Sequence, residues 1–256
     1  MEERKVPGKN ELRKREPVIQ VKNLYKVYRV GETKVYALNG VDFTMYRGEF
    51  CAIVGTSGSG KSTLLNMLAG LEKPTKGEIV IAGQHIEKLN ENQLVAFRRE
   101  RVGFIFQSYN LLGTMNAVEN VALPLSFRGV PRGRRREMAE KYLKMVGLEK
   151  VGDHMPNQMS GGQQQRVGIA RALVVHPEII FADEPTGNLD SASSKEILQI
   201  LKNMHEQGKT VILITHDNGI AAQARRVVRI IDGKIESDFV NENYGKEEYV
   251  KNQLDA

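Results

Sequence analysis

The chain has 256 residues, of which 41% are hydrophobic and 27% charged, and its formal net charge is +6. This length allows one large or two small domains with a sizeable buried core, and the composition excludes disorder for most of the chain. The apolar runs are much shorter than the roughly 18 residues of a membrane-spanning helix, and the N-terminus lacks the apolar region of a signal peptide. The single cysteine, Cys51, is expected to be a small buried residue of a protein in a reducing compartment.

The first part of the chain combines a charged tail with strand patterns. Residues 1–17 are rich in charge and poor in apolar side chains, which is typical of a disordered basic tail. Residues 18–22 and 41–46 alternate apolar and polar side chains, as half-buried strands do. For the stretch between them, which contains Gly31 and Gly40, we expect turns.

A glycine-rich segment follows the apolar run of residues 50–54 and precedes an apolar helix start. Strand, turn and helix in this order form a loop whose backbone N–H groups cradle phosphates, and the helix N-terminus adds a positive partial charge. Lys61 is expected to reach the β- and γ-phosphates, and the Ser62 hydroxyl to bind Mg²⁺. The sequence therefore predicts a nucleoside triphosphate site, formed by Gly55, Thr56, Ser57, Gly58, Ser59, Gly60, Lys61, Ser62 and Thr63.

The next elements are a strand at residues 78–82, a helix-permissive segment at 84–101 and a short buried strand at 102–106 that ends at Gln107. The side chains expected to be buried in the helix-permissive segment are Leu89, Leu94 and Phe97.

The character of the sequence changes after Gln107. Residues 108–158 contain no good strand pattern but several helical periodicities, which are broken by Pro124, Pro131, Gly147 and Pro156. We predict an all-helical insertion over about residues 108–162.

After Gly161 an alternation of helices and strands resumes. The predicted elements are a helix to residue 175, a strand at 179–182, a helix at 191–205 with Ile197, Leu201 and Met204 on one face, a strand at 210–215, and a hairpin of 227–231 with 234–236 through Asp232 and Gly233. This alternation indicates a mainly parallel sheet with its ligand at the carboxyl ends of the strands. Gly55, Asp183 and His216 follow three of these strands, so we expect them to converge.

Two carboxylates end the strand at residues 179–182. Asp183 is expected to hold Mg²⁺, and Glu184 to act as the general base that activates a water molecule.

A second glycine-rich segment, at residues 159–166, begins a helix with Ser160, Gly161 and Gly162. The exposed N–H groups of such a helix start form either an anion site or a plain capped end, and the residues alone leave both readings open.

Taken together, these motifs resemble the ATP-binding-cassette (ABC) ATPases over about residues 18–236. The motifs and their order are Tyr28, the phosphate loop, Gln107, Ser160-Gly161-Gly162-Gln163, Asp183-Glu184, Asp190 and His216. The resemblance implies an α/β fold: a P-loop RecA-like core with a mainly parallel sheet, an N-terminal antiparallel β subdomain and an inserted all-helical subdomain. Residues 237–256 would be a C-terminal extension of this single domain.

The resemblance also implies roles for individual residues in a head-to-tail homodimer with ATP and Mg²⁺ as cofactors. The segment Ser160, Gly161, Gly162 and Gln163 would reach across the dimer to the γ-phosphate bound by the other subunit. Gln107 would contact Mg²⁺ and the attacking water, and His216 would hydrogen-bond the γ-phosphate. Asp190 would link the two sites, and Tyr28 would stack on adenine, with Tyr25 as the nearby competitor.

As to partners, the resemblance implies the motor subunit of a transporter, bound peripherally at the cytoplasmic face of the inner membrane to a separate transmembrane permease. Residues 109–115 would receive the coupling helix of that permease. Three segments resemble the branch that serves macrolide export, lipoprotein release and antimicrobial-peptide export: Gln163-Gln164-Gln165-Arg166, residues 28–32 and residues 109–112. The alternative is a non-transport member such as a cell-division ATPase, and no nucleic-acid partner is expected.

Three features depart from the pattern or are unassigned by it. Met159 and Asn188 replace residues that are usually leucine and a small apolar residue in this family. The run Arg132-Gly133-Arg134-Arg135-Arg136 is either a solvated helix start or a contact with lipid headgroups or a partner.

Overall fold

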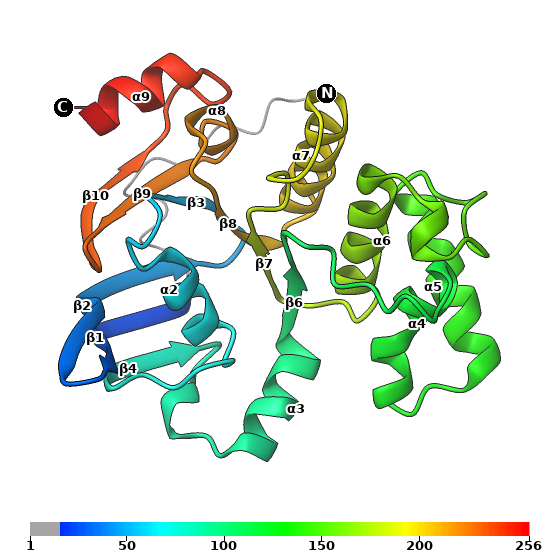
Figure 1. Ribbon diagram of the computed structural model, residues 1–256, viewed down its shortest axis with the longest axis horizontal. Helices are drawn as coiled ribbons and strands as arrows, with labels where there is room; N and C mark the ends of the chain where they lie inside the picture. Colours follow the sequence, from blue (N-terminus) through cyan, green and yellow to red (C-terminus); the bar gives the residue numbers. More distant parts are fainter. Residues whose placement is uncertain (1–15, 256) are drawn as a thin grey trace.

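The computed structural model describes residues 16–255, so most of the predicted basic tail lies outside the described part. Within that part the chain forms two sheets and a separate group of helices (Figure 1). The first sheet is antiparallel, with order β2-β1-β4-β5, and the second has order β10-β9-β3-β8-β7-β6. This α/β architecture confirms the predicted fold class. Within residues 16–255, no helix combines the length and apolarity that a membrane crossing requires.

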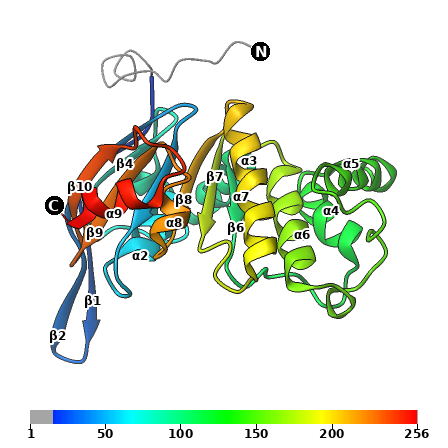
Figure 2. The same cartoon turned by 90° about the horizontal axis from the view of Figure 1, so that it is seen from above.

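The first sheet is built on a long hairpin of β1 (Pro17–Val30) and β2 (Thr33–Tyr46), which projects from the body of the molecule (Figure 2). The predicted strands were too short, and the predicted turn at Gly40 was wrong. Gly40 lies inside β2 with φ of 77°, next to an irregularity in the β1–β2 register. An alanine Cβ there would approach the Tyr25 hydroxyl to 3.0 Å, so glycine at this position permits a bulge and not a chain reversal.

The second sheet is buried on both faces. The strands β3 (Phe50–Val54), β6 (Val102–Ile105), β7 (Ile179–Asp183), β8 (Thr210–Ile214) and β9 (Arg226–Ile231) run parallel, and β10 (Lys234–Val240) pairs antiparallel with β9. Alternate residues of each strand enter opposite cores. Cys51 and Ile53 pack toward helix α2 (Lys61–Leu68) and the antiparallel sheet, whereas Ala52 and Val54 pack toward the other helices. Burial of Cys51, as predicted, raises the pKa of its thiol.

The strand β4 (Lys76–Ile81) and the helix α7 (Ser191–Glu206) lie near their predicted positions. The helix-permissive segment 84–101 is helical only in α3 (Glu91–Arg101), because its first residues form the strand β5 (Gln84–His85) and the 3-10 turn η1 (Ile86–Lys88). All the side chains that were expected to be buried in α3 and before it, and in α7, are buried: Leu89, Leu94, Phe97, Ile197, Leu201 and Met204.

The predicted helical insertion is confirmed as a group of α4 (Ala117–Phe127), α5 (Arg132–Met145), the 3-10 turn η2 (Pro156–Gln158) and α6 (Gly161–Leu173). One predicted break was wrong, because Pro124 lies within α4. A capping box of Asn116 and Glu119 begins that helix, and the buried side chains of Val121 and Leu125 hold it on both sides of the proline. This packing outweighs the single intrahelical hydrogen bond that proline cannot donate.

The chain after β8 contains two helices that the sequence patterns did not predict, α8 (Asn218–Ala221) and α9 (Glu247–Asp255). Val250 is fully buried and Leu254 is 9% exposed, and both belong to the same apolar cluster as the sheet. The C-terminal segment is therefore packed onto the core.

A buried cation joins the two sheets. The Arg226 guanidinium on β9 donates to both carboxylate oxygens of Asp238, at 2.7 and 2.6 Å, to the Thr44 carbonyl at 2.7 Å and to Glu49 at 3.3 Å. Glu49 is only 6% exposed. Burial raises the pKa of Glu49, while the Tyr46 backbone N–H and Arg226 lower it. Arg226 thus compensates a carboxylate that the fold buries.

We predict that Arg226→Ala lowers the free energy of unfolding by about 3 kcal/mol, because it leaves Glu49 buried without its cation. Arg229→Ala on the same strand removes a more exposed pair with Glu236 and should cost less than about 1 kcal/mol. Urea titrations followed by circular dichroism measure both, and equal losses would show that Arg226 acts only as a surface cation.

Candidate active site

Strand register brings the predicted motifs to one edge of the parallel sheet. Ile53 of β3 pairs with Ile214 of β8, and Ile214 pairs with Asp183 of β7. On the other side of β7, Ala182 pairs with Ile105 of β6. The residues that follow these positions are the phosphate loop, His216, Glu184 and Gln107, so all four lie at the carboxyl end of the sheet, as expected.

The phosphate loop is packed so closely that two of its positions exclude any side chain. A Cβ on Gly55 would lie 2.2 Å from the Ile230 carbonyl oxygen, and one on Gly60 would lie 2.3 Å from that of Ala37. Gly60 also has φ of 103°, which side chains disfavour. The loop therefore packs closely against β9 and β2, whereas a Cβ on Gly58, at the tip of the loop, would have no atom within 4 Å. The Ser59 hydroxyl is buried without a hydrogen-bond partner in the structure.

Lys61 lies in the first turn of α2 with only 6% of its surface exposed. Its ammonium group donates to the carbonyls of Gly55 at 2.9 Å and Thr56 at 2.7 Å, so the side chain curls over its own loop. Burial lowers the pKa of Lys61, whereas the nearby Glu184 and Asp183 carboxylates raise it. A cation held over a glycine-rich loop at a helix start is an arrangement that can bind phosphate.

Ser62 and Asp183 form a pair of hard oxygen ligands. The Ser62 hydroxyl donates to Asp183 at 3.5 Å. Burial and the adjacent Glu184 raise the pKa of Asp183, while Ser62 and Lys61 lower it, so a bound cation would relieve the crowding of the two carboxylates. Residues 16–255 contain no cluster of three or more His, Cys, Asp or Glu that could hold a metal alone. Mg²⁺ that is bound together with a nucleotide usually has phosphate oxygens and waters as most of its ligands. One carboxylate and one hydroxyl from the protein are therefore enough to complete such a site.

Glu184 and His216 face each other across the ends of β7 and β8. The His216 Nδ1 atom lies 3.0 Å from the Glu184 carboxylate, and their side chains are 66% and 21% exposed. Glu184 has φ of 42°, a left-handed conformation that costs about 1–3 kcal/mol for a residue with a side chain. Its backbone N–H donates to the Ile214 carbonyl at 3.0 Å, which holds this conformation in place. A carboxylate held at this sheet edge beside an exposed imidazole can accept a proton from water.

Gln107 lies beside the same carboxylate. A Cβ built on Gly187 would lie 2.9 Å from the Gln107 amide nitrogen and 3.4 Å from the Glu184 carboxylate, so Gly187 leaves room for both side chains. The Gln107 carbonyl accepts from the Asn188 amide at 3.2 Å. Asn188, which departs from the family pattern, therefore braces the backbone at Gln107.

Two further residues that support the site could not be identified from sequence patterns. Gln165 of α6 is fully buried, and its amide donates to the carbonyls of Phe106 at 3.2 Å and Pro185 at 2.7 Å. Arg171 of the same helix donates to the Tyr109 carbonyl at 2.8 Å and to that of Asn110 at 2.5 Å. Tyr109 and Asn110 both have positive φ, of 57° and 50°. Helix α6 thus holds the backbone on both sides of Gln107.

The Ser-Gly-Gly segment caps α6. The Ser160 hydroxyl accepts from the Gln163 backbone N–H at 3.3 Å, and the Gln163 side chain accepts from the Ser160 N–H at 2.9 Å. Gly162 faces Ser193, whose hydroxyl lies 2.6 Å from where a Cβ would be, and Gly161 faces Tyr109. Figures 1 and 2 place α6 and α2 on opposite sides of β7 and β8. The structure therefore does not bring this segment to the phosphate loop of its own chain.

Asp190 caps the neighbouring helix α7. Its carboxylate accepts from the backbone N–H groups of Ala192 and Ser193, both at 2.9 Å, and from the Ser193 hydroxyl at 2.8 Å. These hydrogen bonds to Ser193 and Ala192 lower the pKa of Asp190.

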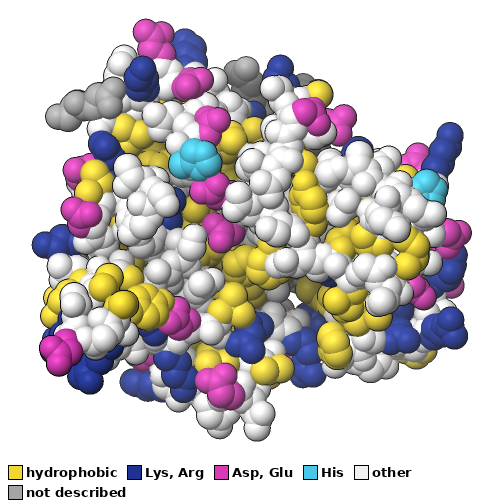
Figure 3. Space-filling model, viewed as in Figure 1, with side chains coloured by type: hydrophobic (Ala, Val, Ile, Leu, Met, Phe, Trp, Pro, Cys, Tyr) yellow, Lys and Arg dark blue, Asp and Glu magenta, His cyan; other side chains and the backbone are white. Residues whose placement is uncertain are grey.

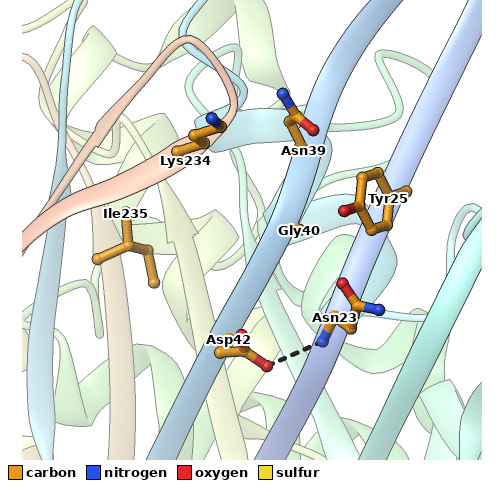
Figure 4. A pocket seen from close by; sticks show the side chains of 7 residues that line it. All are labelled: Asn23, Tyr25, Asn39, Gly40, Asp42, Lys234 and Ile235. Atoms are coloured by element: carbon orange, nitrogen blue, oxygen red, sulfur yellow. Dashed lines mark hydrogen bonds between the residues drawn. The ribbon is translucent and has the colours of Figure 1, made fainter.

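The two candidate tyrosines have different surroundings. The Tyr28 hydroxyl donates to Glu72 at 2.8 Å, and burial together with Glu72 raises the pKa of Tyr28, while the Thr63 side chain lowers it. Thr63 belongs to the phosphate loop, so Tyr28 lies next to that loop. Tyr25 instead lines a separate polar pocket of about 530 Å³ (Figure 4), together with Asn23, Asn39, Gly40, Asp42, Lys234 and Ile235.

Comparisons with known proteins agree with this geometry. Residues 38–187 match a family model described as ABC transporter. A macrolide export ATP-binding/permease protein, MacB, of Hyphomonas neptunium is 51% identical over 232 residues, which are 91% of this chain and 36% of that protein. An uncharacterized ABC transporter ATP-binding protein of Thermotoga maritima is 48% identical over 219 residues, which are 86% of this chain and 94% of that protein.

Solved structures of the ATP-binding cassette MJ0796 are also similar, with a TM-score of 0.83 at 44% identity over 88% of this chain and 100% of that one. Both are described as dimeric, and one as a post-hydrolysis state bound to ADP and Pi. The chain spans about a third of the length of the macrolide export relatives, but nearly the whole of the Thermotoga relative and of MJ0796.

We predict that Glu184→Gln retains ATP binding but lowers the rate of ATP hydrolysis by at least about 100-fold, because the amide cannot accept the proton of the attacking water. Glu178→Gln, just before the opposite end of the same strand, is the matched control and should hydrolyse ATP normally. Steady-state phosphate release measures both rates, and normal turnover by the Glu184 variant would remove this residue as the base.

A second prediction concerns Lys61. Lys61→Ala should weaken ATP binding at least about tenfold, since a hydrogen bond to a charged group contributes roughly 1.5–3 kcal/mol. Lys88→Ala removes an exposed lysine in η1 and should leave the affinity unchanged. Titration with a fluorescent ATP analogue gives both dissociation constants, and undiminished affinity of the Lys61 variant would contradict the phosphate-loop assignment.

Proposed function

The chain belongs to the ABC transporter family and is an ATPase cassette of it, and on this basis we propose that two copies close head to tail on two Mg·ATP and drive a separate membrane permease. The observation that supports the proposal is that the predicted site residues lie in two separate places within one chain. Lys61, Asp183 and Glu184 converge at one sheet edge, whereas Ser160 caps a helix on the far side of β7. A second copy supplies the missing segment, and the dimeric form of the MJ0796 cassette supports this arrangement.

Within the closed dimer we assign the following roles to the side chains of the site. The phosphate loop and Lys61 bind the β- and γ-phosphates, and Tyr28 stacks on the adenine. Ser62 and Asp183 would hold Mg²⁺, which neutralises phosphate charge, with Gln107 nearby. Glu184 takes a proton from the attacking water, while His216 and the partner copy's Ser-Gly-Gly segment orient the γ-phosphate. Positioning and charge stabilisation supply most of the rate enhancement in such a reaction.

The permease would bind at an apolar groove of about 290 Å³ between α3 and α4, and not directly at residues 109–115, none of which lines the groove. Its rim carries two large exposed side chains, Val95 with 52% of its surface exposed and Phe127 with 68%. Arg171 lines the groove and also holds the backbone of Tyr109 and Asn110. A partner helix in this groove would therefore act directly on the segment that carries Gln107.

The macrolide export relatives support a place in the export branch, with a macrolide, a lipoprotein or a peptide as the proposed cargo. We place this subunit at the cytoplasmic face of the inner membrane. In those relatives a single protein combines the ATP-binding and permease parts, whereas the Thermotoga relative is an ATP-binding protein of nearly this length. A cell-division ATPase that pairs with a membrane protein is the second candidate.

Dimer closure gives a direct prediction. Glu184→Gln with Mg·ATP should elute as a dimer in size-exclusion chromatography, and adding Ser160→Arg should keep it monomeric without loss of ATP binding. Ser160→Arg also removes a helix cap worth about 1 kcal/mol, so the matched control adds Asn116→Arg, which removes the capping box of α4. Dimers of both double variants would contradict a role for Ser160 in the interface.

Capture of the permease tests the partner. We expect tagged Glu184→Gln with Mg·ATP to retain a membrane permease from gently solubilised membranes of the source organism, identified by mass spectrometry. Val95→Asp should abolish this capture, while Met145→Asp, at a residue 45% exposed in α5, should not. Capture of cell-division proteins without a transport permease would favour the second candidate.

A further inference from the structure

The arginine run at the start of α5 has no role in the proposed reaction. Arg136 is paired within its own subdomain, with Glu140 at 2.7 Å and Asp153 at 3.5 Å. Arg132, Arg134 and Arg135 have no ion pair with any residue in the described range 16–255. Arg132 and Arg134 are exposed, and Arg135 is half-buried. Three cations thus stand at this helix end without a counter-charge.

The stability of α5 does not explain these arginines. The first turn of the helix has no acidic residue, and its N-cap, Pro131, makes no side-chain cap. Because the N-terminus of a helix carries a positive partial charge, cations in the first turn destabilise it. An unfavourable arrangement on an exposed surface is expected where the charges serve binding.

In the chain, the arginines follow shortly after an exposed aromatic residue that lines the groove between α3 and α4. Phe127 ends α4, five residues before Arg132, and is 68% exposed. The Arg99 guanidinium of α3 donates to the Phe127 carbonyl at 3.3 Å, and that of Arg128 donates to the Val175 carbonyl at 2.9 Å and to the Arg99 carbonyl. The connection from α4 to α5 is therefore fastened to the rim of the groove.

Figure 1 places the α4–α5 connection and α3 at the same lower edge of the molecule, and Figure 3 shows Lys and Arg side chains gathered along that edge over these elements. We propose that Phe127, Arg132, Arg134 and Arg135, the arginine patch, bind anionic lipid headgroups of the membrane that holds the permease. The proposal rests on the proposed function, because a permease seated in the groove turns this edge toward the bilayer.

The chemistry of the patch favours lipid over a protein partner. Guanidinium groups bind phosphate through paired N–H donors, and an aromatic ring at the headgroup level buries its apolar body while cations remain hydrated. Cations without ion-pair partners, a few residues after an exposed ring in the chain, suit a fluid surface that can adapt to them. An acidic protein segment would be the alternative, and it is distinguished in the experiment below.

The experiment is flotation of the full-length chain with vesicles of equal parts phosphatidylglycerol and phosphatidylcholine, and with vesicles of phosphatidylcholine alone. We expect binding only to the anionic vesicles, and weaker binding as salt is raised. The triple variant R132Q/R134Q/R135Q should lose about 100-fold in partition coefficient, since each basic residue near an anionic surface contributes roughly fivefold. Phe127→Ala should weaken binding further.

The matched control is K195Q/K246Q/K251Q, which removes three exposed lysines of α7 and of the α9 region at the opposite edge. It has the same net charge and the same residues 1–15, and it should bind anionic vesicles like the unmodified chain. Both triple variants should keep basal ATPase activity, and the arginine variant should unfold at no lower urea concentration, which excludes misfolding.

Equal losses of vesicle binding by the two triple variants would show that binding depends on net charge alone, which would overturn the proposal. Binding to vesicles of phosphatidylcholine alone would overturn it as well. An arginine variant that binds vesicles normally but no longer captures a permease would assign the patch to a protein partner instead. If no variant captures a permease while the arginine variant still loses vesicle binding, then the proposed function fails and the lipid contact stands.

Discussion

The register of β7 with its two neighbours is the constraint on which the site depends. Asp183 pairs with Ile214 on one side, and Ala182 pairs with Ile105 on the other. These pairings place Glu184 beside both His216 and Gln107. A slip of one residue would turn every side chain of the strand to the opposite face, so side chains shaped for one core would have to pack in the other. Burial of the sheet on both faces therefore also fixes the geometry of the site.

Helix α6 connects that sheet edge with the helical subdomain. Its first residues carry the Ser-Gly-Gly segment, Gln165 bridges the carbonyls of Phe106 and Pro185, and Arg171 holds Tyr109 and Asn110. Both side chains bond to backbone carbonyls in chain segments next to the site, so a movement of α6 carries these segments with it. In the proposed cycle, a permease in the groove and a nucleotide at the sheet edge would act on the same helix.

Much of this arrangement can be predicted from sequence because it depends on local patterns. The phosphate loop has a strand before it and a helix after it, and apolar periodicity locates Ile197, Leu201 and Met204 in the core. The rest depends on contacts between distant segments. The sequence around Gly40 is typical of a turn, and only the pairing of β2 with β1 shows that this glycine lies inside a strand. Pro124 is typical of a helix end, and only the burial of its neighbours explains why α4 continues past it. No spacing rule reveals that Gln165 meets Phe106, 59 residues away.

In the proposed dimer, Ser160 would both stabilise the fold and bind phosphate. In the capping box its hydroxyl oxygen accepts a hydrogen bond from Gln163, which satisfies an N–H group of the helix start. Accepting that bond leaves the hydroxyl proton free, so the same group can donate to a phosphate oxygen without giving up the cap. Asp190 also caps a helix, but its carboxylate only accepts hydrogen bonds and has no proton to donate to a phosphate. The cap of α6 is therefore better suited to phosphate, and that of α7 to a partner's donor groups.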